Sequence, residues 1–272
     1  MSTVSSAWLK RFFLIVLVAL LGLYLSRSPV LAGTLTIEVQ ASLSVNENSV
    51  TGTITVRNRG DEPARKVHAE LLVPGETVVK EIAERLDVQQ KASFTFQKSL
   101  GKMKPGTYAI PVTIIFHDMK LYPFSALACP TFTVGEVSSP AISCSTTPLE
   151  GGGKIEFHLR NLDPFAKQVK TSFLFPREFY CPRPEISLTL EPMESKEIPF
   201  SILRATAIPG ARYPVFSIIA VETEKAHHSL VCTSEIRFLE QGNWFRRTRW
   251  YWLGGWLLLI ASSVGEFIRK KR

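Results

Sequence analysis

The segment RNRGDEPARKVHAELLVP, residues 57–74, decides the fold, because it returns about a hundred residues later as RNLDPFAKQVKTSFLFP, residues 160–176. Each copy reads as the end of one strand, a polar turn and a second strand. Apolar and polar residues alternate after each turn, which is typical of a strand with one buried face. Asn58 matches Asn161 at an offset of 103, and the same offset relates Cys129 to Cys232. This constant offset indicates two copies of one fold.

Period-two alternation continues on both sides of the repeated turn. It predicts strands in TGTITVRN (51–58), SFTFQ (93–97) and GTYAIPVTIIF (106–116), and a last strand over about residues 124–134. Asn58 and Asn161 each end a strand, where a short amide side chain can bond backbone groups of the turn. Many short strands in about a hundred residues predict an antiparallel, immunoglobulin-like β-sandwich. We therefore expect an all-β chain with two tandem sandwiches, residues 34–135 and 140–239.

A family resemblance rests on the first copy. Its carriers are Asn58, Gly60, Pro63, Ala64 and Val67, followed by Leu86, Val88, Phe94 and the run PGTY at 105–108. Together they resemble bacterial immunoglobulin-like modules of the CARDB and NEW3 type. The second copy departs from the pattern, since Asp163-Pro164 replaces the glycine turn. The resemblance implies a β-sandwich used for adhesion, scaffolding or complex assembly, and it implies no chemistry.

The net charge of +8 belongs to the two ends of the chain. Residues 1–33 carry three basic residues and no acidic one, and residues 243–272 carry seven basic residues and one acidic one. The region between holds 22 of the 32 basic and 23 of the 24 acidic residues and is close to neutral. A nucleic-acid-binding domain would carry its basic residues on a folded face. We therefore expect no nucleic-acid partner, and interpret the basic ends as membrane topology signals.

The N-terminal end has the parts of a secretory signal. Lys10-Arg11 precedes the largely apolar run FFLIVLVALLGLYL (12–25), and small residues follow near Ala32. A full membrane span needs about 20 apolar residues, and this run is shorter. Residues 1–32 are therefore predicted to be a signal peptide cleaved after Ala32, with an uncleaved signal anchor as the alternative. Either form would export the segment that follows.

The C-terminal end predicts a transmembrane helix at residues 250–268, which is long enough to cross a bilayer. A basic juxtamembrane segment, 243–249, precedes it, and a basic tail, 269–272, follows it and should stay in the cytoplasm. The predicted membrane interface consists of Trp244, Arg246, Arg247, Arg249, Trp250 and Trp252. The predicted location is the bacterial cytoplasmic membrane, crossed once if the signal is cleaved. The body would lie on the periplasmic or extracellular side.

All four cysteines fall in the predicted exported part, where disulfides form. We expect one bridge within the second sandwich, with Cys144 paired to either Cys181 or Cys232. Cys129 is then expected to be a buried free thiol. No Cys-x-x-Cys pair occurs in the sequence, which argues against a zinc site.

No sequence motif predicts catalysis. The glycine run 151–153 lacks the spacing of a phosphate-binding loop and precedes a predicted strand rather than a helix. His227-His228 is expected at a hairpin, solvated. The sequence therefore predicts no enzyme, no catalytic residue, no cofactor and no metal.

These patterns favour a non-enzymatic, membrane-anchored binding or scaffold protein outside the cytoplasmic membrane. Its expected partners are membrane lipid and a protein in or at the membrane. The alternative is an accessory, sugar-recognising subunit of a membrane transporter or polysaccharide-processing enzyme, with carbohydrate as its partner. The turn at 162–165 differs between the two copies and is an expected place for specificity.

Overall fold

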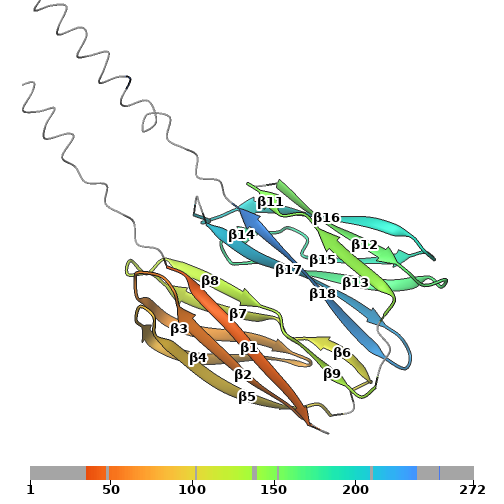
Figure 1. Cartoon of the computed structure of the whole chain (residues 1–272), viewed down its shortest axis with the longest axis horizontal. Helices are drawn as coiled ribbons and strands as arrows, with labels where there is room; N and C mark the ends of the chain where they lie inside the picture. Colours follow the sequence, from red (N-terminus) through yellow and green to blue (C-terminus); the bar gives the residue numbers. More distant parts are fainter. Residues whose placement is uncertain are drawn as a thin grey trace, which may run out of the picture. The chain divides into compact units, whose positions relative to one another are not determined.

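The computed structural model describes residues 35–46, 49–101, 103–136, 140–151, 153–208, 211–237 and 251, and strands dominate these ranges (Figure 1). The all-β prediction is confirmed. The strands before residue 137 are β1 (Ile37–Asn46), β2 (Ser49–Asn58), β3 (Ala64–Val73), β4 (Glu76–Leu86), β5 (Lys91–Ser99), β6 (Gly106–Ala109), β7 (Val112–His117), β8 (Pro123–Ala128) and β9 (Thr131–Val134). Those after residue 139 are β10 (Ile142–Thr146), β11 (Leu149–Glu150), β12 (Gly153–Asn161), β13 (Lys167–Leu174), β14 (Phe179–Tyr180), β15 (Glu185–Leu190), β16 (Ser195–Arg204), β17 (Arg212–Glu222) and β18 (His227–Arg237).

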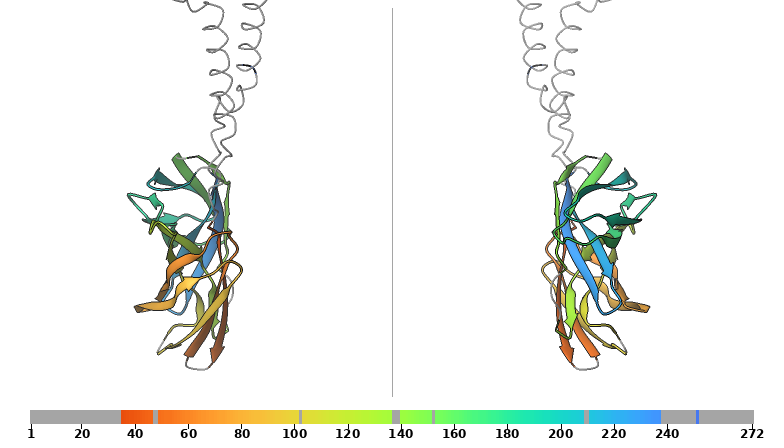
Figure 2. Two further views of the ribbon diagram at one scale, coloured as in Figure 1. Left: turned by 90° about the vertical axis from the view of Figure 1, so that its left-hand side faces the viewer. Right: turned by 90° about the vertical axis from the view of Figure 1, so that its right-hand side faces the viewer.

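Most strands of the first half form two antiparallel sheets around one core. The first sheet has the order β1-β2-β5 and the second β4-β3-β7-β8. Every second residue of β2 is buried, as the alternation in its sequence requires. Ile54 of β2, Leu71 of β3 and Ile114 of β7 are fully buried in the same core, so both sheets contribute to it. Figure 2 shows the strand layers from two sides.

The second half repeats this plan with a more aromatic core. One sheet has the order β10-β12-β16-β14, and the other contains β15-β13-β17-β18. Phe157 of β12, Phe173 of β13 and Phe200 of β16 form a ring cluster, with ring centroids 4.8 to 5.9 Å apart. Because Phe173 belongs to one sheet and the other two rings to its neighbour, this cluster joins the two layers of the half.

Two strands predicted to be continuous are divided at prolines. Ile110-Pro111 separates β6 from β7, and Cys129-Pro130 separates β8 from β9. The prediction of single strands over 106–116 and 124–134 was therefore wrong, because Pro111 and Pro130 have no N–H for the ladder and the chain passes to a different sheet at each of them. The N–H of Ile110 donates to the carbonyl of Pro130 at 2.9 Å and holds the two breaks side by side.

At each break the chain passes from one sheet to another: β7 and β8 belong to the sheet of β3, whereas β6 and β9 belong to the sheet of β18. β6 and β9 pair with each other, and β6 pairs in parallel with β18 through Gly106 opposite His227. Tyr108 and Phe132 of these strands still pack into the first core. The sheet that contains β17 and β18 thus includes two strands from the predicted first sandwich, β6 and β9.

Several predicted segments lie outside the described residues. These are the signal at 1–32, the juxtamembrane segment 243–249, the tail 269–272 and the helix 250–268 apart from Tyr251. The predicted interface residues Trp244, Arg246, Arg247, Arg249, Trp250 and Trp252 lie there too. Within the described ranges, no helix combines the length and apolar character needed to span a membrane.

Candidate functional site

The repeated turn is held by a buried asparagine in each half. Asn58 donates through Nδ2 to the carbonyl of Glu62 at 2.7 Å, and its Oδ1 accepts from the N–H of Gly60 at 2.9 Å. Asn161 donates to the carbonyl of Phe165 at 2.8 Å and accepts from the N–H of Asp163 at 3.1 Å. Both side chains are fully buried. This confirms the predicted amide-to-backbone bonding, and it makes the turn core a structural element.

What differs between the two turns is their exposed surface. The first carries charged residues at 59, 61 and 62, whereas the second carries Leu162 and Phe165. Phe165 is 72% exposed and Leu162 is 46% exposed. The second turn therefore presents an aromatic ring and an aliphatic side chain to solvent from a rigid base, and such side chains commonly anchor partners.

A pocket of about 440 Å³ lies beside Phe165. Its walls come from the start of β10, the turn, and the adjoining ends of β13, β17 and β18, and include Asp163, Lys167, Glu222 and His228. Lys167 pairs with Asp163 across a distance of 3.0 Å, and both are largely shielded from solvent. The site thus combines an exposed ring with charged groups fixed on strand ends.

His228 lines this pocket and has a buried ring nitrogen. The residue is 7% exposed, and its Nδ1 has no hydrogen-bond partner among the described residues. Burial lowers the pKa of His228 below its ordinary 6.5, and the neighbouring His227 and Lys167 lower it further. The ring is therefore neutral at pH 7 and can offer one donor and one acceptor. The prediction of a solvated histidine pair was wrong for His228, because β18 begins at His227 and turns the next side chain inward.

A second pocket, of about 480 Å³, adjoins the first, since Gln168 and Glu222 line both. Its surface includes polar side chains of β13, β15 and β18: Gln168, Lys170, Ser187, Thr189 and His227. We call the two pockets together the β13–β17 groove. It runs from the apolar turn onto the polar face of the sheet.

The first half supports one side of this groove. Lys104 pairs with Glu222 at 2.7 Å and also donates to the carbonyl of Thr223. Nδ1 of His227 lies 2.6 Å from the other oxygen of Glu222, and its ring stacks on Tyr108 with centroids 4.4 Å apart. Bonding to His227 and Lys104 holds the pKa of Glu222 below its ordinary value. Glu222 is therefore a fixed anion at neutral pH.

A second set of contacts between the two halves lies at the other end of β17 and β18. Glu178 is 2% exposed and accepts two hydrogen bonds from Ser125 of β8. Nη2 of its neighbour Arg177 donates to both carboxylate oxygens of Glu70 of β3, each at 2.8 Å. Burial raises the pKa of Glu178 above its ordinary value. These contacts join residues of the first half to residues of the second half and restrict motion between them.

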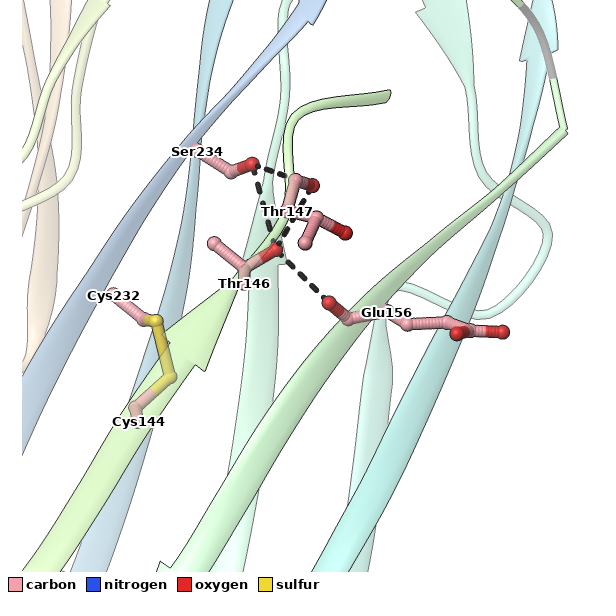
Figure 3. The surroundings of a disulfide bond; sticks show 6 residues. All are labelled: Cys144, Thr146, Thr147, Glu156, Cys232 and Ser234. Atoms are coloured by element: carbon pink, nitrogen blue, oxygen red, sulfur yellow. Dashed lines mark hydrogen bonds between the residues drawn. A yellow bond between two sulfur atoms is a disulfide. The ribbon is translucent and has the colours of Figure 1, made fainter. Parts of the chain in front are cut away.

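The structure joins Cys144 of β10 to Cys232 of β18, one of the two pairings that the sequence left open (Figure 3). The bridge connects the two sheets of the second half across a Cα separation of 6.0 Å. Next to it, Thr146 donates to the carbonyl of Glu156 at 2.9 Å and approaches Ser234 at 3.4 Å. Cys181 is a buried free thiol and Cys129 a half-buried one. Burial raises the pKa of Cys129 to about 12, so it stays protonated.

Among the described residues, no three histidine, cysteine or carboxylate side chains form a group that could hold a metal ion. The expected lack of catalytic and cofactor-binding residues stays a prediction.

No family model matches the chain, and no curated protein matches it. Among solved structures it is similar to native E. coli alpha-2-macroglobulin, with 10% identity, a TM-score of 0.29, and coverage of 75% of this chain but 17% of that one. A Porphyromonas gingivalis W83 protein of unknown function gives 11% identity, a TM-score of 0.29, and coverage of 75% and 99%. The FN1–FN3 domains of chicken CNTN1 give 9% identity, a TM-score of 0.21, and coverage of 74% and 65%. Likenesses at these TM-scores assign no activity.

Proposed function

We propose that this chain is a non-enzymatic binding or scaffold protein, anchored in a bacterial cytoplasmic membrane, that assembles a protein partner at the outer face. In this proposal the two halves are tandem immunoglobulin-like β-sandwiches of the CARDB or NEW3 type. The two-sheet, single-core plan of each half and the shared asparagine turn support that assignment. The predicted signal and the C-terminal apolar segment supply the anchor.

The observation that carries the proposal is the exposed pair Leu162 and Phe165 beside the β13–β17 groove. The two copies share the buried asparagine and differ in this surface, so the change adds contact area without altering the scaffold. An aromatic ring next to a pocket with fixed charges suits a protein partner, because interfaces combine an apolar anchor with polar contacts around it. Bonds from Lys104 and His227 to Glu222 hold one wall of the groove, which is built mainly from strand residues rather than from a long loop.

A photocrosslinking experiment tests this assignment. A photoreactive amino acid replaces Phe165 in the full chain, expressed in its native membranes, and Val79 serves as the matched control because it is 63% exposed on β4. We expect a discrete crosslinked product from position 165 that position 79 does not give. The same product from both positions, or none from position 165, would contradict the proposed binding surface.

One observation favours the alternative, sugar recognition. The second pocket exposes amide, hydroxyl and imidazole groups of Gln168, Ser187, Thr189 and His227, which suit the hydroxyls of a saccharide. An accessory subunit of a transporter or polysaccharide-processing enzyme would use this end of the groove. Oligosaccharide binding that Gln168→Ala abolishes and Phe165→Ala leaves unchanged would favour the alternative over protein assembly.

A further inference from the structure

The turn between β7 and β8 presents three neighbouring apolar side chains to solvent. Met119 is 45% exposed, Leu121 52% and Tyr122 61%, and Lys120 lies between them. We call residues 118–122 the β7–β8 tip. In a chain whose other apolar side chains mostly alternate into two cores, a run of exposed ones at a turn is unusual, and exposed apolar clusters mark contact sites.

The tip is rigid, so its exposure does not come from fraying. Oδ1 of Asp118 accepts from the N–H groups of Lys120 and Tyr122, both at 2.8 Å. Two backbone bonds of 3.1 Å, Leu121 to Asp118 and Asp118 to Tyr122, close the turn. Leu121 adopts φ 65°, a conformation that glycine or asparagine would adopt at lower cost. The chain thus holds a leucine outward in a strained conformation.

The strand registers place this tip at the end where the described chain begins. Ile37, near the start of β1, lies opposite Asn58 at the end of β2. β3 begins just after that turn, and its Arg65 lies opposite His117, the residue before the tip. Figure 1 shows β1 and β8 starting at the same end. The segment that follows the apolar run at 12–25 therefore joins the body at this end, and the ten residue-to-residue steps from position 25 to position 35 can span at most about 35 Å.

The C-terminal exit lies at this end as well. β18 runs from His227, which lies opposite Gly106, to Arg237, which lies opposite Arg212. Residues 174 and 216 are paired near the same end, where the chain continues to Glu178. Glu178 bonds Ser125, three residues after Tyr122. A C-terminal anchor therefore holds this end near the membrane even if the N-terminal signal is removed.

We propose that the β7–β8 tip contacts the outer lipid surface, with Met119, Leu121 and Tyr122 at the boundary between headgroups and acyl chains. Aliphatic side chains enter the apolar edge of this zone, tyrosine places its ring there with the hydroxyl in water, and a lysine side chain extends toward lipid phosphates. The tip then acts as a membrane contact in addition to the anchor and sets the tilt of the body. This inference rests on the membrane anchoring proposed above and adds a specific lipid-contacting element to it.

The test uses the full chain reconstituted in bilayers of phosphatidylethanolamine and phosphatidylglycerol. Leu121→Cys and, separately, Tyr122→Cys are labelled with an environment-sensitive fluorophore, and lipids carrying a nitroxide near the headgroup serve as quenchers. Val79→Cys is the matched control, because Val79 is as exposed as Tyr122 and lies seven residues along β4 from the tip end of the sheet. The unsubstituted chain corrects for labelling of Cys129 and Cys181.

We expect a severalfold greater loss of fluorescence at positions 121 and 122 than at 79. Equal quenching at all three positions, or none at 121 and 122 in protein that alkaline washing leaves in the bilayer, overturns the lipid contact and leaves the anchoring proposal intact. A blue-shifted but unquenched label at the tip also overturns it, because a protein surface would then cover the tip. Release of the whole protein by alkaline washing overturns the anchoring proposal itself, and the tip inference with it.

Discussion

Ser125 donates two hydrogen bonds to a single carboxylate, that of Glu178: its N–H to Oε1 at 3.0 Å and its hydroxyl to Oε2 at 2.7 Å. The same hydroxyl accepts from the N–H of Arg177 at 2.8 Å. Glu178 is almost fully buried, and a buried carboxylate is costly unless its oxygens are bonded. The two halves of the chain are thus held together by a contact whose loss leaves a buried polar group unsatisfied.

Replacing Ser125 by alanine is expected to destabilise the protein by about 1–3 kcal/mol, because one oxygen of Glu178 and the N–H of Arg177 lose their partner. Urea unfolding followed by circular dichroism measures the change. Ser93→Ala is the matched control, since Ser93 is exposed and bonds only the hydroxyl of Thr55 in the described contacts. A change of less than about 0.5 kcal/mol in the free energy of unfolding of both variants would show that the contact between Ser125 and Glu178 does not stabilise the protein.

Glu178 also predicts a pH dependence. Its pKa in the folded protein lies above the ordinary 4.5, so the folded state retains a proton that the unfolded chain has released. Stability from this group is complete below pH 4.5 and is lost as the pH rises through the folded pKa. Glu178→Gln should remove this decline, which unfolding midpoints measured from pH 4 upward would reveal. An unchanged pH profile in the variant would contradict the assignment.

Gly106→Ala is expected to cost about 3 kcal/mol or more, or to prevent folding, because a Cβ at this position would overlap the carbonyl oxygen of His227. Gly101→Ala serves as the control. It also has a positive φ, but no neighbouring atom would meet its Cβ, so only backbone strain of about 1 kcal/mol is expected. Similar losses in both variants would show that the parallel pairing of β6 with β18 contributes little.

Reduction of the Cys144–Cys232 disulfide, which joins residues 88 apart, should lower the stability of the second half by about 4.6 kcal/mol in the chain-entropy description. Chemical unfolding with and without reductant measures this loss. The double variant Cys144→Ser, Cys232→Ser should be insensitive to reductant, whereas Cys129→Ser should keep the sensitivity of the parent. Reductant sensitivity that persists in the double variant would point to a different pairing.

Much of the scaffold could be predicted from the sequence, because it rests on local patterns. Alternation identified β2 and β3, and the offset between Asn58 and Asn161 identified the repeated turn. The pairing of β6 with β18 could not be predicted, since it joins segments some 120 residues apart and leaves no periodic signal. Pro111 and Pro130 mark the breaks, although the sequence predicts one strand through each of them.

The candidate groove was only partly visible in the sequence. The altered turn at 162–165 was predictable, because it differs from its counterpart. Burial of His228 and Glu178 was not, because a histidine or glutamate in a polar stretch looks solvated until its neighbours are known. The position of Cys144, Cys181 and Cys232 in the predicted second sandwich left two partners for Cys144, and only the three-dimensional arrangement of β10 and β18 distinguishes them.

Alkaline extraction of membranes containing the full chain tests the central claim most directly. The membrane-anchored scaffold predicts that the full chain stays in the pellet, whereas a chain ending at Gly242 is released as a folded, soluble body, because only the first retains the apolar segment at 250–268. Release of the full chain into the alkaline wash would contradict the claim.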